Sequence, residues 1–294
     1  MQTALFAGLV TLDMAYGVDA FPAENSKNTV RDHFLGAGGP TANAAVTYAF
    51  LAKKSPVLLT SLGKHRVADL VRDDLLSQQV QLIDATPDST QQPPVSSIVV
   101  ARDSGSRTVV SLDAVRSYAP FSDTFIEFVS QATIVLIDGH HPDLAYGVAA
   151  AARNLGIPVV LDAGRWKDVH ESILPLVDVA ICSSDFTPPG MKSADSARVL
   201  EFIHACGPTK AAITRGSDPI MCSTDRHLSE IEIAPIDAVD TLGAGDILHG
   251  AYCYYATQGY GFTESLEMAS TVATTSCQHF GTRDWQNYVT RSEP

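Results

Sequence analysis

Apolar and polar residues follow two different periods along this chain, and the two periods alternate. Short apolar runs, typical of buried strands, give way to segments in which apolar residues recur every three or four positions, as in helices with one buried face. Strands are expected at Thr3–Val10, Pro56–Leu62, Ala132–Ile137, Ile157–Leu161, Val177–Cys182 and Lys210–Thr214, with a hairpin through Pro219–Ser223. Helices are expected at Val67–Gln78, Asp143–Asn154, Ala194–Cys206, Gly245–Thr257 and Thr263–His279. This order predicts a three-layer α/β/α fold with a mostly parallel sheet.

Two segments interrupt the alternation. Met14–Leu35 and Pro94–Leu112 are rich in β-formers, and neither is followed promptly by a helix. The second contains two β-rich arms around a Ser-Gly turn, which is typical of a hairpin. We expect both segments to form a small β-sheet that acts as a lid, so residues 1–294 make a single domain.

Composition narrows the class of protein. Of 294 residues, 45% are hydrophobic, and the net charge is -13, which disfavours a general nucleic-acid binder. No apolar run approaches the ~18 residues that span a bilayer, so no membrane role is expected. The N-terminus lacks a basic region and reaches Asp13 too early for a secretory signal. Five cysteines, an odd number without metal-binding spacing, indicate free thiols and a cytoplasmic protein.

The strongest chemical signal is the string Asp240-Thr-Leu-Gly-Ala-Gly-Asp246, which directly precedes an apolar helix. Its glycines allow a tight turn and close approach of a ligand to the backbone. Helix N-terminal amides then face the same point, where phosphate charge would be stabilised. Asp246 is placed to accept a proton from an attacking hydroxyl. The alternative is a glycine turn with an acidic first-turn residue and no ligand.

A second group of candidates lies near the N-terminus. Asp13 follows the first strand, and Gly38-Gly39-Pro-Thr-Ala-Asn43 follows the first intruding segment. A carboxylate and an amide are groups that bind sugar hydroxyls, and paired glycines permit close approach. The alternatives are an Asp at a strand end and an Asn that caps a helix.

These motifs resemble the ribokinase-like (PfkB) carbohydrate kinases, and the likeness covers nearly the whole chain in the right order. The resemblance implies that Asp246 is the general base and that the amides of Gly243, Ala244 and Gly245 form an anion hole. It also implies that the sugar is held by Asp13, Gly38, Gly39 and Asn43. Implied cofactors are ATP and Mg²⁺, with K⁺ as a candidate activator, and a homodimer through the lid is an expected assembly.

The nucleotide side of the resemblance is less complete. Thr214-Arg-Gly216 resembles the start of the family's nucleotide loop, but Pro219 stands where its last glycine usually lies. Thr241 and Cys277 are further candidates for binding the nucleotide, although Cys277 fits an ordinary core position equally well. The family's Asn-x-x-Glu metal motif is replaced by Cys182-Ser-Ser-Asp185, so Asp185 is a candidate for holding Mg²⁺ through water, or a plain helix cap.

Within the family, the likeness is expected to be closest to the ketohexokinase branch. It rests on Gly8–Asp13, on His65–Asp74 and on Ser106-Arg107-Thr-Val109, which makes Arg107 a candidate sugar-binding residue. Arg107 could equally be a surface residue of a hairpin. Pro40 departs from that branch, where an Asn contacts the sugar.

The sequence therefore predicts an ATP-dependent kinase that phosphorylates a hydroxyl of a small sugar, with a ketose as the expected acceptor. An adenosine or nucleoside kinase and a sugar-phosphate kinase of the same fold are alternatives. A sugar-binding or regulatory protein without turnover is an alternative of another class, which an intact Asp246 disfavours. A dinucleotide-dependent oxidoreductase is disfavoured because no G-x-G-x-x-G follows the first strand.

Overall fold

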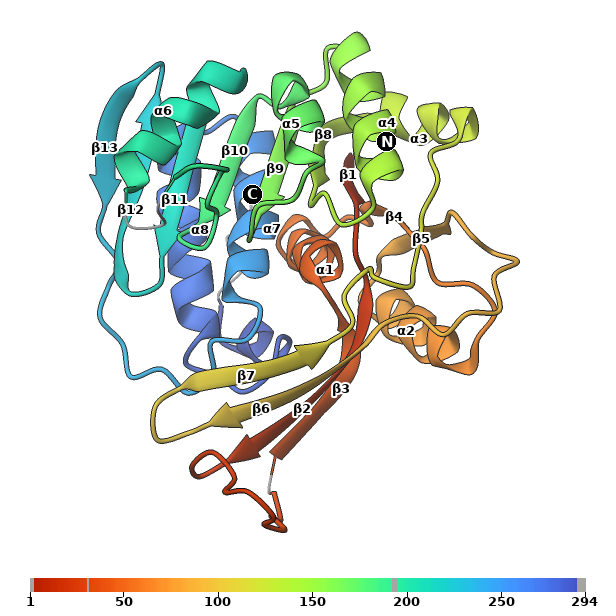
Figure 1. Ribbon diagram of the computed structural model, residues 1–294, viewed down its shortest axis with the longest axis vertical. Helices are drawn as coiled ribbons and strands as arrows, with labels where there is room; N and C mark the ends of the chain where they lie inside the picture. The colour runs from red at the N-terminus through yellow and green to blue at the C-terminus, as the bar shows by residue number, and fades with distance from the viewer. Residues whose placement is uncertain (1–2, 31, 192–194, 290–294) are drawn as a thin grey trace.

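A nine-stranded sheet forms the centre of the molecule (Figure 1). The computed structural model describes residues 3–30, 32–191 and 195–289. The strand order is β13-β12-β11-β10-β9-β8-β1-β4-β5. The strands are β1 (Thr3–Ala7), β4 (Val57–Thr60), β5 (Gln81–Asp84), β8 (Ala132–Ile137), β9 (Val159–Ala163), β10 (Val179–Ser183), β11 (Lys210–Arg215), β12 (Asp218–Thr224) and β13 (His227–Ile231). All neighbours pair in parallel except β11–β12 and β12–β13, which are antiparallel.

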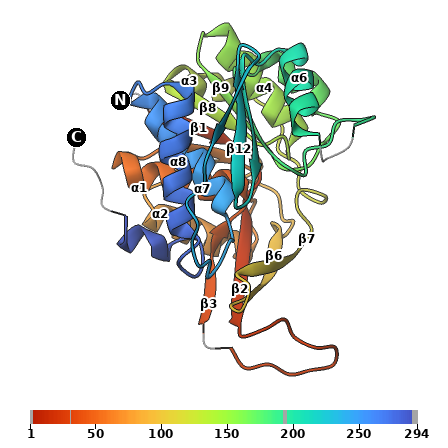
Figure 2. The same ribbon diagram turned by 90° about the vertical axis from the view of Figure 1, so that its left-hand side faces the viewer.

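Helices cover both faces of this sheet (Figure 2). One apolar core lies beneath α1 (Pro40–Ala52), α2 (Arg66–Ser77), α7 (Ala244–Thr257) and α8 (Phe262–Ser276). The other lies beneath α3 (Ile126–Ser130), α4 (Pro142–Asn154), α5 (His170–Ile173) and α6 (Ser196–Cys206). Three short 3₁₀ helices complete the described elements: η1 (Asp123–Phe125), η2 (Leu174–Leu176) and η3 (Asp284–Asn287). The predicted three-layer fold class is confirmed.

A separate four-stranded sheet lies against one edge of the main domain (Figure 1). Its order is β3-β2-β6-β7, built from β2 (Thr11–Val18), β3 (Asp32–Gly38), β6 (Val95–Ala101) and β7 (Ser106–Ser111). Its inner face packs Ile98 and Val100 against Leu242 and Phe280 of the main domain. These strands come from the two segments that interrupt the α/β pattern. Movement of this sheet as a lid stays a prediction.

The burial pattern explains where the expected elements and the structure differ. Helix α1 has no predicted counterpart because Thr41 to Leu51 are all buried, so no polar face marks its period. The first strand ends at Ala7 rather than Val10 because Gly8 turns the chain toward β2. Strand β5 is a short edge strand with mostly half-buried residues and escapes the pattern. Ala194, the expected start of α6, lies outside the described residues.

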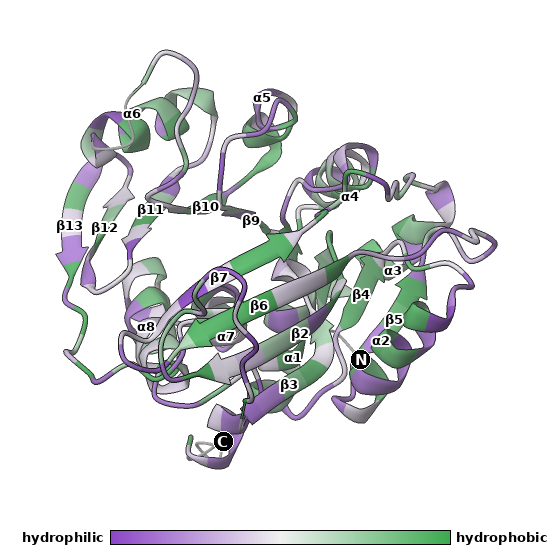
Figure 3. Ribbon diagram, turned by 60° about the horizontal axis from the view of Figure 1, so that its bottom comes forward, coloured by the Kyte–Doolittle hydropathy of each residue, from purple (hydrophilic) through white to green (hydrophobic). Residues whose placement is uncertain are grey.

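The sheet order also determines where a ligand can bind. After β1 the chain builds β4 and β5 on one side and β8 to β11 on the other, so the connections diverge between β1 and β8. In open α/β sheets, ligands bind beyond the carboxyl ends of the strands at such a point. Strand β4 is coloured hydrophobic in Figure 3, as expected for a strand buried on both faces, whereas the edge strand β13 is partly hydrophilic. Among the described residues, no helix is long and apolar enough to cross a membrane.

Candidate active site

A cleft of about 810 Å³ lies between the carboxyl edge of the large sheet and the second sheet. It gathers residues from loops that are far apart in the sequence. Its walls come from the β1–β2 region, the start of α1, strands β6 and β7, the loops after β8 to β11, and the start of α7. Of the predicted site residues, Asp13, Gly39, Asn43, Arg107, Asp185, Thr214, Gly243, Gly245 and Asp246 line it.

The loop before α7 is held in place by its own first residue. The buried Asp240 carboxylate accepts hydrogen bonds from the amides of Leu242 and Gly281, each at 2.8 Å. Gly243 then takes the left-handed conformation, with φ of 69°, and precedes the first helical residue, Ala244. The next amides, including that of Gly245, belong to the first helical turn, where N–H groups have no partner within the helix. A Cβ added at Gly245 would meet no atom within 4 Å, so the backbone there is open to the cleft.

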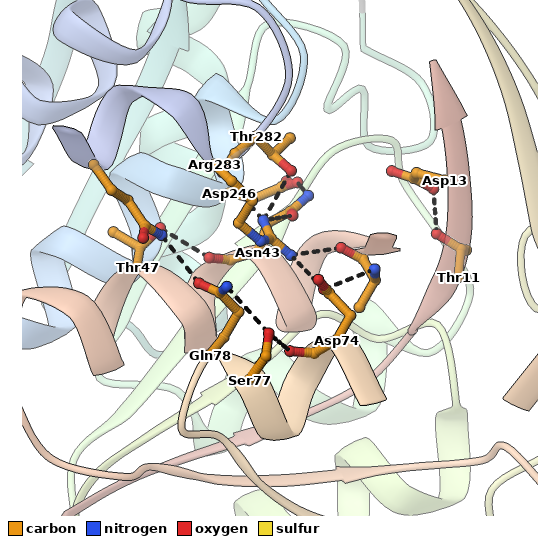
Figure 4. Close-up of polar contacts among 12 residues, drawn as sticks. Thr11, Asp13, Asn43, Thr47, Asp74, Ser77, Gln78, Asp246, Thr282 and Arg283 are labelled. Atoms are coloured by element: carbon orange, nitrogen blue, oxygen red, sulfur yellow. Dashed lines mark hydrogen bonds and ion pairs between the residues drawn. The ribbon is translucent and has the colours of Figure 1, made fainter. Parts of the chain in front are cut away.

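Asp246 lies in the first turn of α7, where its side chain is half-buried. Its Oδ2 accepts a hydrogen bond from Asn43 Nδ2 at 2.8 Å (Figure 4). Burial, together with the carboxylate of Asp162, raises the pKa of Asp246 to about 7, although Asn43, His249 and Arg107 oppose the shift. A carboxylate with a pKa near the working pH is suited to accept a proton from a hydroxyl.

Asp162 and His249 form a mostly buried pair near the Asp246 carboxylate. His249 Nδ1 lies 2.7 Å from the carbonyl oxygen of Gly245 and 3.4 Å from Asp162 Oδ2. Its Nε2 lies 3.0 Å from the carbonyl oxygen of Ile181. These contacts hold the imidazole between the first turn of α7 and the end of β10, beside the carboxylate of Asp162.

Asp13 also lines the cleft, and the residue is 4% exposed. Thr11 Oγ1 donates to Asp13 Oδ1 at 2.5 Å. Burial raises the pKa of Asp13, while hydrogen bonds from Thr11 and Ser96 oppose the shift. A Cβ at Gly38 would lie 1.9 Å from Asp13 Oδ2, so this glycine is required by the position of the carboxylate. Gly39 has φ of 87°, and a Cβ there would lie 2.7 Å from the carbonyl oxygen of Leu9.

Arg107 reaches from β7 to the loop before α7. Its Nη1 donates to Thr241 Oγ1 at 2.8 Å, and the Thr241 hydroxyl donates to the carbonyl oxygen of Gly105 at 3.2 Å. The guanidinium therefore lies beside the loop from Asp240 to Asp246. Thr241 links this loop to the turn between β6 and β7.

The nucleotide candidates lie at the far end of the cleft or beside it. Thr214 and Asp185 line the cleft, and the exposed Gly216 has φ of 66° with open space around it. Cys277 contributes its carbonyl oxygen, which accepts from the amides of Val239 and Asp240 at 2.8 and 3.1 Å. Burial raises the pKa of its thiol, so the thiol is not activated.

The described part of the chain contains no cluster of three His, Cys, Asp or Glu side chains that could hold a metal ion. Asp185 is exposed, and its amide is bonded to Ser183 Oγ at 3.1 Å. This donor set fits a Mg²⁺ ion that is held mainly by phosphate oxygens, because Mg²⁺ commonly keeps several waters and takes few protein ligands.

Comparison with known proteins identifies the family. The model of the pfkB family of carbohydrate kinases matches residues 1–287. The chain belongs to this family. Arabidopsis thaliana ribokinase is 23% identical over 286 residues, covering 92% of this chain and 75% of the relative. The ATP-dependent ribose-1-phosphate kinase of Halopiger xanaduensis is 27% identical over 250 residues, covering 84% and 82%.

Solved structures of the pfkB fold agree. The structure of Giardia lamblia ribokinase gives a TM-score of 0.82 at 17% identity, with 99% of this chain and 97% of that chain covered. The structure of Arabidopsis thaliana ribokinase complexed with ribose and ATP gives 0.76 at 21% identity, covering 96% and 94%. These likenesses establish the fold.

The expected closeness to ketohexokinase is wrong. Mouse ketohexokinase matches at 28% identity over only 109 residues, which is 37% of this chain, whereas ribokinases match over most of its length. The motifs that suggested ketohexokinase are short, and the rest of the chain does not extend the likeness.

Three side chains at this pfkB site have no place in the sequence motifs. Asp162 and His249 line the cleft, and Arg283 lies behind Asn43. Asp162 is the second-last residue of strand β9 and could have been noticed as an acidic residue near the carboxyl end of a buried strand. His249 lies one turn after Asp246, and its contacts are with Asp162 of β9 and Ile181 of β10, which are distant in sequence. Arg283 follows α8 in a polar stretch, so no local pattern marks it.

Proposed function

We propose that this chain transfers the γ-phosphoryl group of ATP to a hydroxyl of a small, uncharged sugar. The observation that carries the proposal is a carboxylate with a pKa of about 7, Asp246, at the open N-terminus of α7. It shares one cleft with a buried carboxylate suited to sugar hydroxyls, Asp13. A base, an anion-binding turn and a sugar-binding group in one cleft are the parts that phosphoryl transfer requires.

The proposed mechanism begins with the acceptor hydroxyl beside Asp246. The carboxylate accepts its proton while the hydroxyl oxygen bonds to the γ-phosphorus and the bond to the β-phosphate oxygen breaks, releasing ADP. Amides of Gly243, Ala244 and Gly245 stabilise the charge on the transferred group, and Arg107 adds a cation beside them. Mg²⁺ would neutralise phosphate charge when bound, with Asp185 contributing through water.

The acceptor is proposed to be a sugar of the size of ribose or fructose. Asp13, Gly38 and Gly39 offer a carboxylate and close backbone approach, and the second sheet adds the apolar side chains of Ile98 and Val109. Such a wall suits the carbon face of a sugar ring. The ribokinases and the ketohexokinase among the relatives act on sugars of this size by name.

A phosphorylated sugar is the second candidate. Arg165 and Lys167, from the loop after β9, line the same cleft as Arg107 and His140. Cations of this kind would hold a second phosphate. The Halopiger relative is named for ribose 1-phosphate, which makes this ligand the direct comparison.

The test is ATP turnover by purified protein with ribose, fructose, ribose 1-phosphate, fructose 6-phosphate and adenosine. We expect kcat/KM to be highest for a free sugar. Asp246→Asn should lower kcat at least ~10²-fold, the usual contribution of a positioned general base, with little change in ATP affinity. Preference for a sugar phosphate would favour the second candidate. Sugar binding without turnover in the wild-type protein would indicate a binding protein and contradict the proposal.

A further inference from the structure

Arg283, between α8 and η3, lies close to Asn43 and to the proposed base Asp246 (Figure 4). Its side chain is 14% exposed. Nη1 donates to Asn43 Oδ1 at 3.0 Å and to the hydroxyl of Thr282 at 2.8 Å. Nη2 donates to the carbonyl oxygen of Ala37 at 2.6 Å and lies 3.4 Å from Asp74 Oδ2. One guanidinium thus contacts strand β3, helix α1 and helix α2.

These contacts determine which way the Asn43 amide points. A guanidinium can only donate hydrogen bonds, so the Asn43 oxygen must face Arg283. The Asn43 NH₂ group must then face Asp246, whose ionised carboxylate can only accept. The reversed amide would place two donors together on one side and two acceptors on the other, losing both hydrogen bonds. The orientation of Asn43 is therefore determined by Arg283.

The same side chain also anchors the end of strand β3, which carries Gly38 and leads directly to Gly39. Asp74 Oδ2 accepts from the amide of Ala37 at 2.9 Å, while Arg283 bonds the Ala37 carbonyl. The guanidinium carbon lies 5.7 Å from the ring centre of Phe34, in the same strand, β3. Arg283 therefore contacts both Asn43, which bonds the proposed base, and the end of strand β3 beside Gly38.

The charges around Asp246 and Arg283 show why a contact through Asn43 would affect the ionisation of Asp246. Asp162 opposes ionisation of Asp246, whereas His249 and Arg107 favour it, as does the hydrogen bond from Asn43. The charged groups that face Arg283 are Asp74 of α2, Asp13 of β2 and Asp246 of α7. Loss of Arg283 removes a positive charge near Asp246 and frees Asn43 to turn, and both changes favour the protonated carboxylate.

We propose that Arg283 is a positioning residue of the phosphoryl-transfer site, which acts through Asn43 to keep Asp246 aimed and ionised. The proposal rests on the proposed function of Asp246 as the base. It assigns a role in catalysis to a residue that does not line the cleft.

The experiment compares Arg283→Met, Arg283→Lys, Asn43→Ala and the double variant Asn43→Ala/Arg283→Met with the wild-type protein. Arg283→Met should lower kcat roughly 10- to 100-fold, because misplacement of a catalytic group by about 1 Å costs on that order. The acid limb of kcat/KM against pH should move upward by about half a unit or more, while KM for ATP stays unchanged. Arg283→Lys keeps the charge without the planar fork, so it should restore the pH limb more than kcat.

The double variant tests whether Arg283 acts through Asn43. With the Asn43 side chain already removed, the loss of Arg283 should lower kcat no further, because Arg283 can no longer act on Asp246 through Asn43. The matched control is Arg72→Met. Arg72 also donates to a carbonyl, that of Gly63, and to a carboxylate, Asp84, each at 2.7 Å, but it has no contact with the base. This control should lower stability without moving the pH limb.

Each outcome separates this inference from the proposed function. A wild-type protein that turns over no acceptor overturns the proposed function and, with it, the role of Arg283. An active wild type with normal kcat and pH profile in Arg283→Met overturns the inference alone. Additive losses in the double variant also overturn it. If Arg283→Met does not fold, the pH limb and kcat of Arg283→Lys decide: a lysine variant identical to the wild type contradicts the need for the guanidinium fork.

Discussion

Asn43 Nδ2 donates to Asp246 Oδ2 at 2.8 Å, although 203 residues separate them in the chain. The bond joins the first helix of the fold to the seventh, and α1 and α7 pack against each other beside the cleft. The side-chain amide of Asn43, which was expected to bind a sugar, thus contacts the Asp246 carboxylate through its nitrogen and Arg283 through its oxygen. Asn43 therefore connects the proposed general base to Arg283, the residue proposed to position it.

The pH dependence of kcat/KM should have an acid limb near neutrality. Burial and Asp162 raise the pKa of Asp246 to about 7, and a general base must be ionised to accept a proton. Activity should therefore be half-maximal near pH 7, approach its maximum above about pH 8, and fall about tenfold per pH unit well below pH 7. His249→Asn should move this limb upward, because His249 opposes the raised pKa of Asp246. A profile that is flat between pH 5 and 8 would contradict the assignment.

Asp246→Asn should stabilise the protein at neutral and alkaline pH. Between the ordinary value of 3.8 and about 7, the unfolded chain has released a proton that the folded chain still holds. The free energy of unfolding therefore falls as pH rises through this range, by at most ~4 kcal/mol for a shift of about three units. The asparagine removes this loss.

Denaturant unfolding at pH 4.5 and pH 8 measures that gain. It should be small at the lower pH and larger at the higher one. Asp73→Asn, at an exposed position on α2, is the control and should give equal stability changes at both values. A pH-independent effect of Asp246→Asn would contradict a raised pKa of Asp246 in the folded protein.

Two glycines of one loop should respond differently to alanine. Gly245 has open space around an added Cβ and lies in a helical turn, so Gly245→Ala should keep or slightly raise stability while the methyl group obstructs the anion site. We expect kcat to fall at least ~10-fold, since one lost donor at such a site costs on the order of 10². Unchanged turnover in a folded variant would make the loop merely structural.

Gly243→Ala is the matched comparison. Gly243 has φ of 69°, and its Cβ would lie 2.8 Å from Thr282 Cγ2. Stability should fall by ~1–3 kcal/mol together with activity, because a non-glycine residue in this region is strained. Thermal unfolding of both variants under one condition separates the two effects.

Gly38→Ala should damage sugar binding specifically. The new Cβ would lie 1.9 Å from Asp13 Oδ2, so the carboxylate must move. KM for the sugar should rise, about as it does in Asp13→Ala, while KM for ATP stays near the wild-type value. Gly261→Ala, at the start of α8 with open space around it, is the control. An equal rise in both KM values would place Asp13 outside the sugar site.

The sequence alone was sufficient to predict the alternation of strands and helices, the intruding small sheet and the loop from Asp240 to Asp246. These features are local: periodicity marks each element, and glycines beside a helix start mark the loop. Helix α1 escaped prediction because burial on all sides removes the polar face that a period needs. Asp13, Asn43 and Asp246 could be named as candidates one by one, but their mutual contacts could not.

Only the tertiary structure decided which side chains share the cleft and in what state. The contacts of Asp162, His249 and Arg283 join β9, α7 and the C-terminal segment, whose neighbours are distant in sequence. Their effect on Asp246 depends on burial and on distances of a few ångströms, which no local pattern encodes. The sequence determined the chemical groups that are available, and the packing of α1, α7 and β9 determined the surroundings of Asp246, its pKa and the side chains that contact it.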